Sequence, residues 1–120
     1  MITTSQDFAA LLNAERAVVF TFFDWSGQAH LSLRVFQNWE REWVASNPLP
    51  PIAFFRLDPD NLKVCWDWIV AQAHGDEGTD GGFGATIWVR RGEGIGFLRF
   101  TAMAGEESLA RLTRKYFCST

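Results

Sequence analysis

The segment from Asp24 to His30 holds the residue types that most often carry out catalysis. Asp24, Ser26 and His30 have the composition of a hydrolase triad, in which a histidine activates a serine and a carboxylate orients the histidine. Closeness in sequence does not create that geometry, and the chain has no Gly-x-Ser-x-Gly motif to place a serine on a sharp turn. Because serine is also a preferred residue just before a helix, we expect Ser26 to cap one.

Thiol chemistry would have to come from Cys65 or Cys118, the two cysteines of the chain. They lie too far apart in sequence for a redox pair or a metal-ligand spacing. Cys65 falls on an apolar helical stripe and is expected to be a small buried hydrophobe, whereas Cys118 is expected to be exposed and oxidisable. A monothiol reaction through either cysteine remains an alternative. The apolar content makes a disulfide between them unnecessary, and unpaired thiols favour a cytoplasmic location.

Two other groupings suggest metal binding only weakly. The acidic segment at residues 76–81 is faintly similar to a calcium loop, but Gly78 and Ile87 stand where the third and twelfth loop positions need oxygen ligands. His30 and His74 are too few and too widely separated for a zinc site. We therefore predict no metal and no cofactor.

Composition excludes further classes of partner. A net charge of −3 provides no basic surface for nucleic acid. No apolar run approaches the ~20 residues of a membrane-spanning helix, and the first residues lack the basic and apolar regions of a signal peptide. With 120 residues, 48% of them hydrophobic, the chain is expected to form a single domain over residues 1–120 with its own core.

The elements that must position these residues follow from hydrophobic periodicity. Phe8, Leu11 and Leu12 have the spacing of a first short helix. Residues 17–23 form a nearly unbroken apolar run, which is typical of a central strand covered on both faces. A long helix is predicted over residues 29–45 and ends at a proline-rich segment. Its expected apolar stripe consists of Leu31, Val35, Phe36, Trp39 and Trp43.

A second strand is predicted over residues 52–57. It is followed by a helix that Asp58 is expected to cap and Pro59 to begin. A Gly- and Asp-rich loop at residues 74–84 is expected to be exposed. The core-facing stripe of the helix before this loop is predicted to be Leu62, Cys65, Trp66, Ile69, Val70 and Ala73.

The last third of the chain is expected to form a β-hairpin and a helix. Strands are predicted over residues 85–90 and 95–101, on either side of Arg91-Gly92-Glu93-Gly94. A final helix is expected to begin near Gly105. The order helix, β-α-β, α, β-β-α allows a parallel crossover followed by an antiparallel pair backed by a helix.

The loop Trp25-Ser26-Gly27-Gln28-Ala29 resembles the Trp-Cys-Gly-Pro-Cys active-site loop of thioredoxins. Further thioredoxin segments are matched in the same order, and the resemblance covers most of the chain. It implies an α/β, thioredoxin-like fold of three layers, with a four-stranded mixed central sheet flanked by helices and the loop at residues 74–84 as an insertion. The matching segments are Arg56-Leu57-Asp58 (Asn-Ile-Asp in the family), Gly84-Ala85-Thr86 (Ile-Pro-Thr), Arg91-Gly92-Glu93 (Asn-Gly-Glu) and the last helix.

The same comparison removes the chemistry of the family. Ser26 takes the place of the nucleophilic cysteine and Ala29 that of the resolving cysteine, so the resemblance implies no dithiol–disulfide exchange. Phe20 matches the family's buried acid, and Ala85 matches its cis-proline. A cis peptide before a residue other than proline costs ~3 kcal/mol, so we expect the Gly84-Ala85 peptide to be trans. Some glutathione transferases of the same fold use a serine, which leaves glutathione binding at Ser26 as an alternative.

These observations predict a redox-inactive thioredoxin-like domain that binds an unidentified protein or peptide. Trp68 and Trp88 are expected to lie off the core-facing stripes. Trp25 is expected to be an exposed anchor for a partner, and ordinary packing of these rings against the loop at residues 74–84 is the alternative. A homodimer that packs through exposed aromatic residues is a further hypothesis. The predicted binding residues are Trp25, Ser26, Gly27, Gln28, Ala29, His30, Gly84 and Ala85.

Overall fold

The computed structural model describes residues 5–46, 50–72 and 82–118. A four-stranded sheet in the order β2-β1-β3-β4 forms the middle layer. Strand β1 is parallel to β2 and antiparallel to β3, which in turn is antiparallel to β4, so the sheet is mixed as predicted. The strands are β1 (Arg16–Thr21), β2 (Ala53–Leu57), β3 (Thr86–Arg90) and β4 (Glu93–Leu98).

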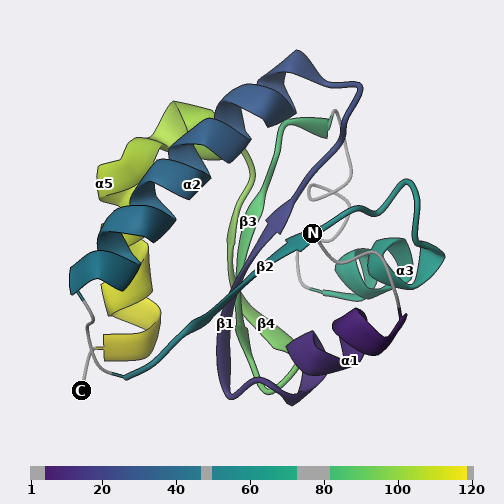
Figure 1. The fold of residues 1–120 in the computed structure, drawn as a ribbon, viewed down its shortest axis with the longest axis horizontal. Coiled ribbons are helices and arrows are strands. Elements are labelled where there is room, and N and C mark those ends of the chain that lie inside the picture. Colours follow the sequence, from purple (N-terminus) through teal and green to yellow (C-terminus); the bar gives the residue numbers. More distant parts are fainter. Residues whose placement is uncertain (1–4, 47–49, 73–81, 119–120) are drawn as a thin grey trace.

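Helices cover both faces of this sheet (Figure 1). Helices α2 (Gly27–Ser46) and α5 (Thr101–Thr113) pack on one face, and α5 continues into a π-helical turn, η2 (Arg114–Cys118). The shorter helices α1 (Ser5–Asn13) and α3 (Lys63–Ala71) pack on the other face. The predicted three-layer α/β architecture is confirmed.

Alternation along β1 divides the core in two, because successive side chains of a strand point to opposite faces. Ala17 and Val19 contribute to the cluster under α1 and α3, together with Leu57, Cys65 and Ile69. On the other face, an aromatic cluster lies under α2 and α5 and contains Val18, Phe20, Phe36, Trp39, Trp88, Leu109 and Phe117. The predicted central strand is therefore buried on both faces.

The predicted start of α3, at Pro59, is too early in the chain. Asp58 does not cap this helix at Pro59; instead its carbonyl accepts hydrogen bonds from the backbone N–H groups of Asn61 and Leu62, at 3.2 and 3.1 Å. Its carboxylate accepts a further bond from the Asn61 side-chain amide at 2.6 Å. These bonds form a turn, and the helix begins only at Lys63.

Parts of the predicted stripes are also wrong. Trp66 and Val70 of α3 are exposed, as are Leu31 of α2 and Leu12 of α1. Of the two tryptophans of α3, Trp68 is the one that packs against the core. Its ring meets Phe8 edge-on, and its indole N–H donates to the Gly92 carbonyl at 3.0 Å. Periodicity could not choose between these faces because aromatic and aliphatic residues occur on both.

Trp88 was likewise expected off the core and is fully buried. Its indole N–H donates to the Thr113 hydroxyl at 2.9 Å, and that hydroxyl donates to the Leu109 carbonyl at 2.7 Å. The buried indole is thus satisfied by a polar group that α5 supplies.

The predicted hairpin is confirmed with a shorter turn. Arg91 and Gly92 alone connect β3 to β4, with φ of 51° and 84°. Two successive residues of positive φ match the right-handed twist of the flanking strands. The last helix begins at Thr101 instead of near Gly105, where α5 is kinked. Most of the loop predicted at residues 74–84, with His74, Ala73 and the acidic segment at residues 76–81, lies outside the described residues.

Candidate functional site

Ser26 caps α2, as predicted. Its hydroxyl accepts a hydrogen bond from the backbone N–H of Ala29 at 3.2 Å and donates to the Gln28 side-chain carbonyl at 3.3 Å. Its own carbonyl accepts the N–H of His30 at 3.2 Å. Only 3% of Ser26 and none of Ala29 is exposed. The hydroxyl therefore serves the free N–H groups at the start of the helix.

The hydrolase-like trio does not assemble into a triad. Nε2 of His30 lies 2.9 Å from the backbone carbonyl oxygen of Asp24, not from its carboxylate. The His30 ring stands edge-on to Phe22, with centroids 5.0 Å apart. Since the Ser26 hydroxyl is bonded to Gln28 and Ala29, no relay connects these side chains.

Trp25 is held in one position and is nevertheless 64% exposed. Its indole N–H donates to the Asp60 carboxylate at 2.7 Å, and its ring packs against Phe23 with centroids 5.8 Å apart. The ring also lies over Gly82, where an added Cβ would stand 2.7 Å from Cη2 of the indole. Sequence reasoning missed Asp60 and Gly82, because only the folded chain brings them to Trp25.

Gly84 and Ala85 lie next to this loop, but they are buried. The Ala85 carbonyl accepts the Thr21 N–H at 2.9 Å, and the Ala85 N–H donates to the Thr21 hydroxyl at 3.0 Å. The Gly84 carbonyl accepts the Thr101 N–H at 3.1 Å. These backbone groups are thus used within the fold. That the Gly84-Ala85 peptide is trans stays a prediction.

The eight predicted binding residues therefore divide into two groups. Trp25, Gly27, Gln28 and His30 are exposed and form what we call the Trp25 surface. The other four, Ser26, Ala29, Gly84 and Ala85, are buried and position the loop from below.

A pair of stacked rings close to this surface was not predicted. Phe83 and Phe100 lie 4.9 Å apart with nearly parallel planes, and the Arg99 guanidinium lies 5.2 Å from the Phe83 centroid. The Ser32 hydroxyl joins the two backbone segments that carry these rings. It donates to the Phe83 carbonyl at 2.8 Å and accepts the Ala102 N–H at 3.0 Å. A half-buried aromatic pair here extends the apolar character of the neighbourhood of Trp25.

The two cysteines lie in different halves of the core. Cys65 is fully buried in the cluster under α1 and α3, whereas Cys118 is partly buried against the cluster under α2 and α5. Both are free thiols. Burial raises the pKa of Cys65 to about 11; a backbone hydrogen bond with Asp58 opposes this rise, and the negative charge of Asp58 adds to it. Cys65 is therefore a neutral thiol at physiological pH, with poor nucleophilicity.

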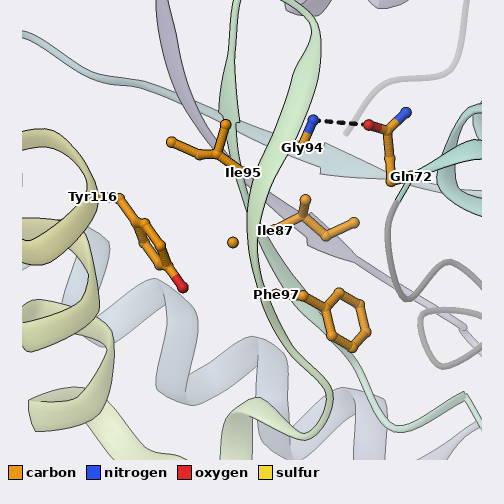
Figure 2. A pocket seen from close by; sticks show the side chains of 7 residues that line it. Gln72, Ile87, Gly94, Ile95, Phe97 and Tyr116 are labelled. Carbon is orange, nitrogen blue, oxygen red and sulfur yellow. Dashed lines mark hydrogen bonds between the residues drawn. The ribbon is translucent and has the colours of Figure 1, made fainter.

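A partly enclosed pocket lies elsewhere, beside β4 (Figure 2). It measures about 230 Å³. Gln72 accepts the Gly94 N–H on one side at 2.8 Å, and the Tyr116 ring covers Gly96 on the other. The strand also has a bulge at its pairing with Trp88 and Val89. A bulge and a backbone donor that is already bonded both protect the edge of a sheet from pairing with another strand.

Similarity to solved structures identifies the architecture. The chain superposes on oxidised thioredoxin from Plasmodium falciparum with a TM-score of 0.66 and 15% identity, over 96% of this chain and 94% of that one. The fold is thioredoxin-like. Thioredoxin from Trypanosoma brucei brucei matches with a TM-score of 0.63 and 15% identity, over 94% and 88% of the two chains. Zinc-bound human ERp44 matches with a TM-score of 0.68 and 16% identity, over 95% of this chain and 30% of that one.

No protein-family model and no curated protein matches the sequence. Within residues 5–46, 50–72 and 82–118, no three potential metal ligands cluster together. Nor does any helix in this part of the chain have the length and apolar character needed to cross a membrane.

Proposed function

We propose that this protein is a redox-inactive thioredoxin-like domain that binds a protein or peptide through the Trp25 surface. The observation that carries the proposal is Trp25 itself. A large ring that is 64% exposed yet anchored by Asp60, Phe23 and Gly82 loses little conformational freedom when a partner covers it. Rigid, exposed aromatic side chains of this kind are frequent hot spots of binding.

The positions beside Trp25 support recognition over catalysis. Where a thioredoxin has its two cysteines, this chain has a serine occupied in helix capping and a buried alanine. The carbonyls of Gly84 and Ala85 already accept hydrogen bonds within the fold. A partner would therefore be contacted by side chains of the Trp25 surface and not by these backbone groups. We propose a cytoplasmic location because both thiols are unpaired, as is usual in a reducing compartment.

Of the thiol-dependent alternatives, glutathione binding at Ser26 and monothiol chemistry at Cys65 have less support from the geometry, and a monothiol reaction at Cys118 stays an alternative. A serine that could stabilise the thiolate of glutathione would need a free hydroxyl, and that of Ser26 is 3% exposed and already bonded. Monothiol chemistry at Cys65 would require a thiolate that burial disfavours.

Peptide-display selection against the wild-type chain, followed by calorimetry on the selected peptides, tests the proposal. We expect Trp25→Ala to weaken binding at least about tenfold, which corresponds to ~1.4 kcal/mol. The matched control is Trp66→Ala, which removes another exposed indole, from α3, and should leave binding unchanged. Equal binding by Trp25→Ala, or reduction of insulin disulfides by the wild type, would show that the proposal is wrong.

A further inference from the structure

The two edges of the sheet differ in how well they are protected. Strand β4 is bulged, and Gln72 occupies one of its donors. Strand β2, at the opposite edge, pairs with β1 in unbroken register from Ala53 to Leu57. It has no bulge and no proline, and its single charged residue is Arg56. Regular edges of this kind are templates for pairing with another strand.

The hydrogen bonds of β1 identify which groups of β2 face outward. The Leu57 carbonyl accepts the Phe22 N–H at 2.9 Å, so Leu57 directs its backbone groups toward β1. Along a strand, the N–H and C=O of one residue point to the same side, and the side alternates from residue to residue. Phe54 and Arg56 therefore direct their N–H and C=O groups to the other side of β2, where no strand of residues 5–46, 50–72 or 82–118 pairs with them.

We infer that a second copy of this chain pairs with this edge, β2 against β2 in antiparallel orientation about a two-fold axis at Phe55. In this register Phe54 of each copy lies opposite Arg56 of the other copy. The two symmetry-related pairs use all four outward N–H groups and all four outward C=O groups of the two strands. The same register keeps the two Arg56 side chains apart and sets each guanidinium against a Phe54 ring. The two Phe55 rings meet at the axis, where the non-hydrogen-bonded pair brings side chains closest.

The surface beside the edge suits a second copy as well. A shallow groove of about 510 Å³ lies between α2 and Arg56, and Val44 on its wall is 58% exposed. Glu40 and Arg41 line the same groove and carry opposite charges. Two antiparallel copies of α2 can match such charges reciprocally, as a two-fold interface requires. The inference does not depend on the function proposed for the Trp25 surface.

Sedimentation velocity over a range of concentrations tests this pairing with two substitutions at one position. Arg56→Pro removes an outward N–H without removing a hydrogen bond to β1, and proline is tolerated at strand edges of that kind. We expect wild type to dimerise with rising concentration, Arg56→Ala to dimerise more weakly, and Arg56→Pro to stay monomeric with an unchanged circular dichroism spectrum. A wild type that is monomeric at all concentrations, or a dimer that persists in Arg56→Pro, would overturn the inference.

A cross-link gives a second test that does not require the proline variant to fold. In a Cys118→Ala background, Phe55→Cys places two thiols at the two-fold axis, at a Cα separation of ~4.5 Å that suits a disulfide. Mild oxidation is expected to give a covalent dimer of Phe55→Cys and none of Ile95→Cys, its counterpart on β4. Equal cross-linking of both variants, or of neither, would contradict the inference.

Discussion

A serine in place of a catalytic cysteine has a structural task in this protein. Ser26 sits at the N-terminus of α2, where the first backbone N–H groups have no partner within the helix. Its hydroxyl binds the N–H of Ala29, and its burial removes water as a substitute acceptor. The residue that would be the nucleophile of a thioredoxin is here an anchor for the helix and for the adjoining Trp25.

Replacing Ser26 with alanine should therefore lower stability. We expect Ser26→Ala to reduce the free energy of unfolding by about 1 kcal/mol, the usual loss when an N-cap side chain is removed. Ser46→Ala is the matched control in the same helix, since its exposed hydroxyl binds only the Trp43 carbonyl at the far end. Urea denaturation of both variants measures the difference, and equal stabilities would argue against a capping role.

The connection between β1, α2 and β3 depends on a close approach at Gly84. This residue has a φ of 89°, and an added Cβ would lie 2.7 Å from Cβ of Ser32 and 2.8 Å from Cζ of Phe20. Glycine thus lets β3 begin directly against α2 and the Phe20 ring. The resemblance to thioredoxins drew attention only to the next residue, Ala85, which matches the family's proline, and it did not reveal this close approach at Gly84.

Gly84→Ala is expected to lower the free energy of unfolding by at least about 2 kcal/mol, because backbone strain and overpacking add. Gly27→Ala, in the first turn of α2, should change it by less than about 0.5 kcal/mol, since no atom lies within 4 Å of the added Cβ. Thermal or urea denaturation compares the two. A tolerated Gly84→Ala would mean that α2 and β3 can separate at little cost.

The molecule as a whole buries the Cys65 thiol completely, and this makes its global stability sensitive to pH. The pKa of Cys65 is about 11 in the folded protein and 9.0 for an ordinary thiol. The unfolded chain therefore loses this proton first as pH rises. The stability that the neutral buried thiol contributes is fully present below about pH 9 and is lost as pH rises through 11.

The ionisation of Cys65 predicts that the difference in stability between wild type and Cys65→Ala depends on pH. The free energy of unfolding of wild type, minus that of Cys65→Ala, is expected to fall by about 2 kcal/mol between about pH 8 and about pH 11. Taking the difference removes the titration that both proteins share. Chemical denaturation at several pH values measures it, and a constant difference would mean that Cys65 ionises in the folded protein as readily as in the unfolded chain.

Local patterns in the sequence were enough to predict the order of elements, the doubly buried β1, the hairpin and the cap at Ser26. Each depends on residues close in the chain: apolar runs, a serine before a helix, a glycine in a turn. The absence of cysteines from the loop at residues 25–29 also needed no structure.

Tertiary packing decided the features that depend on distant partners. Asp60 and Gly82 fix Trp25, Ser32 joins Phe83 to Ala102, and Thr113 satisfies the buried Trp88. Packing against α1 also decided that Trp68, and not Trp66, turns toward the core. Periodicity shows that a helix has apolar faces, but the neighbouring elements determine which of those faces is buried, and only the folded chain brings such partners together.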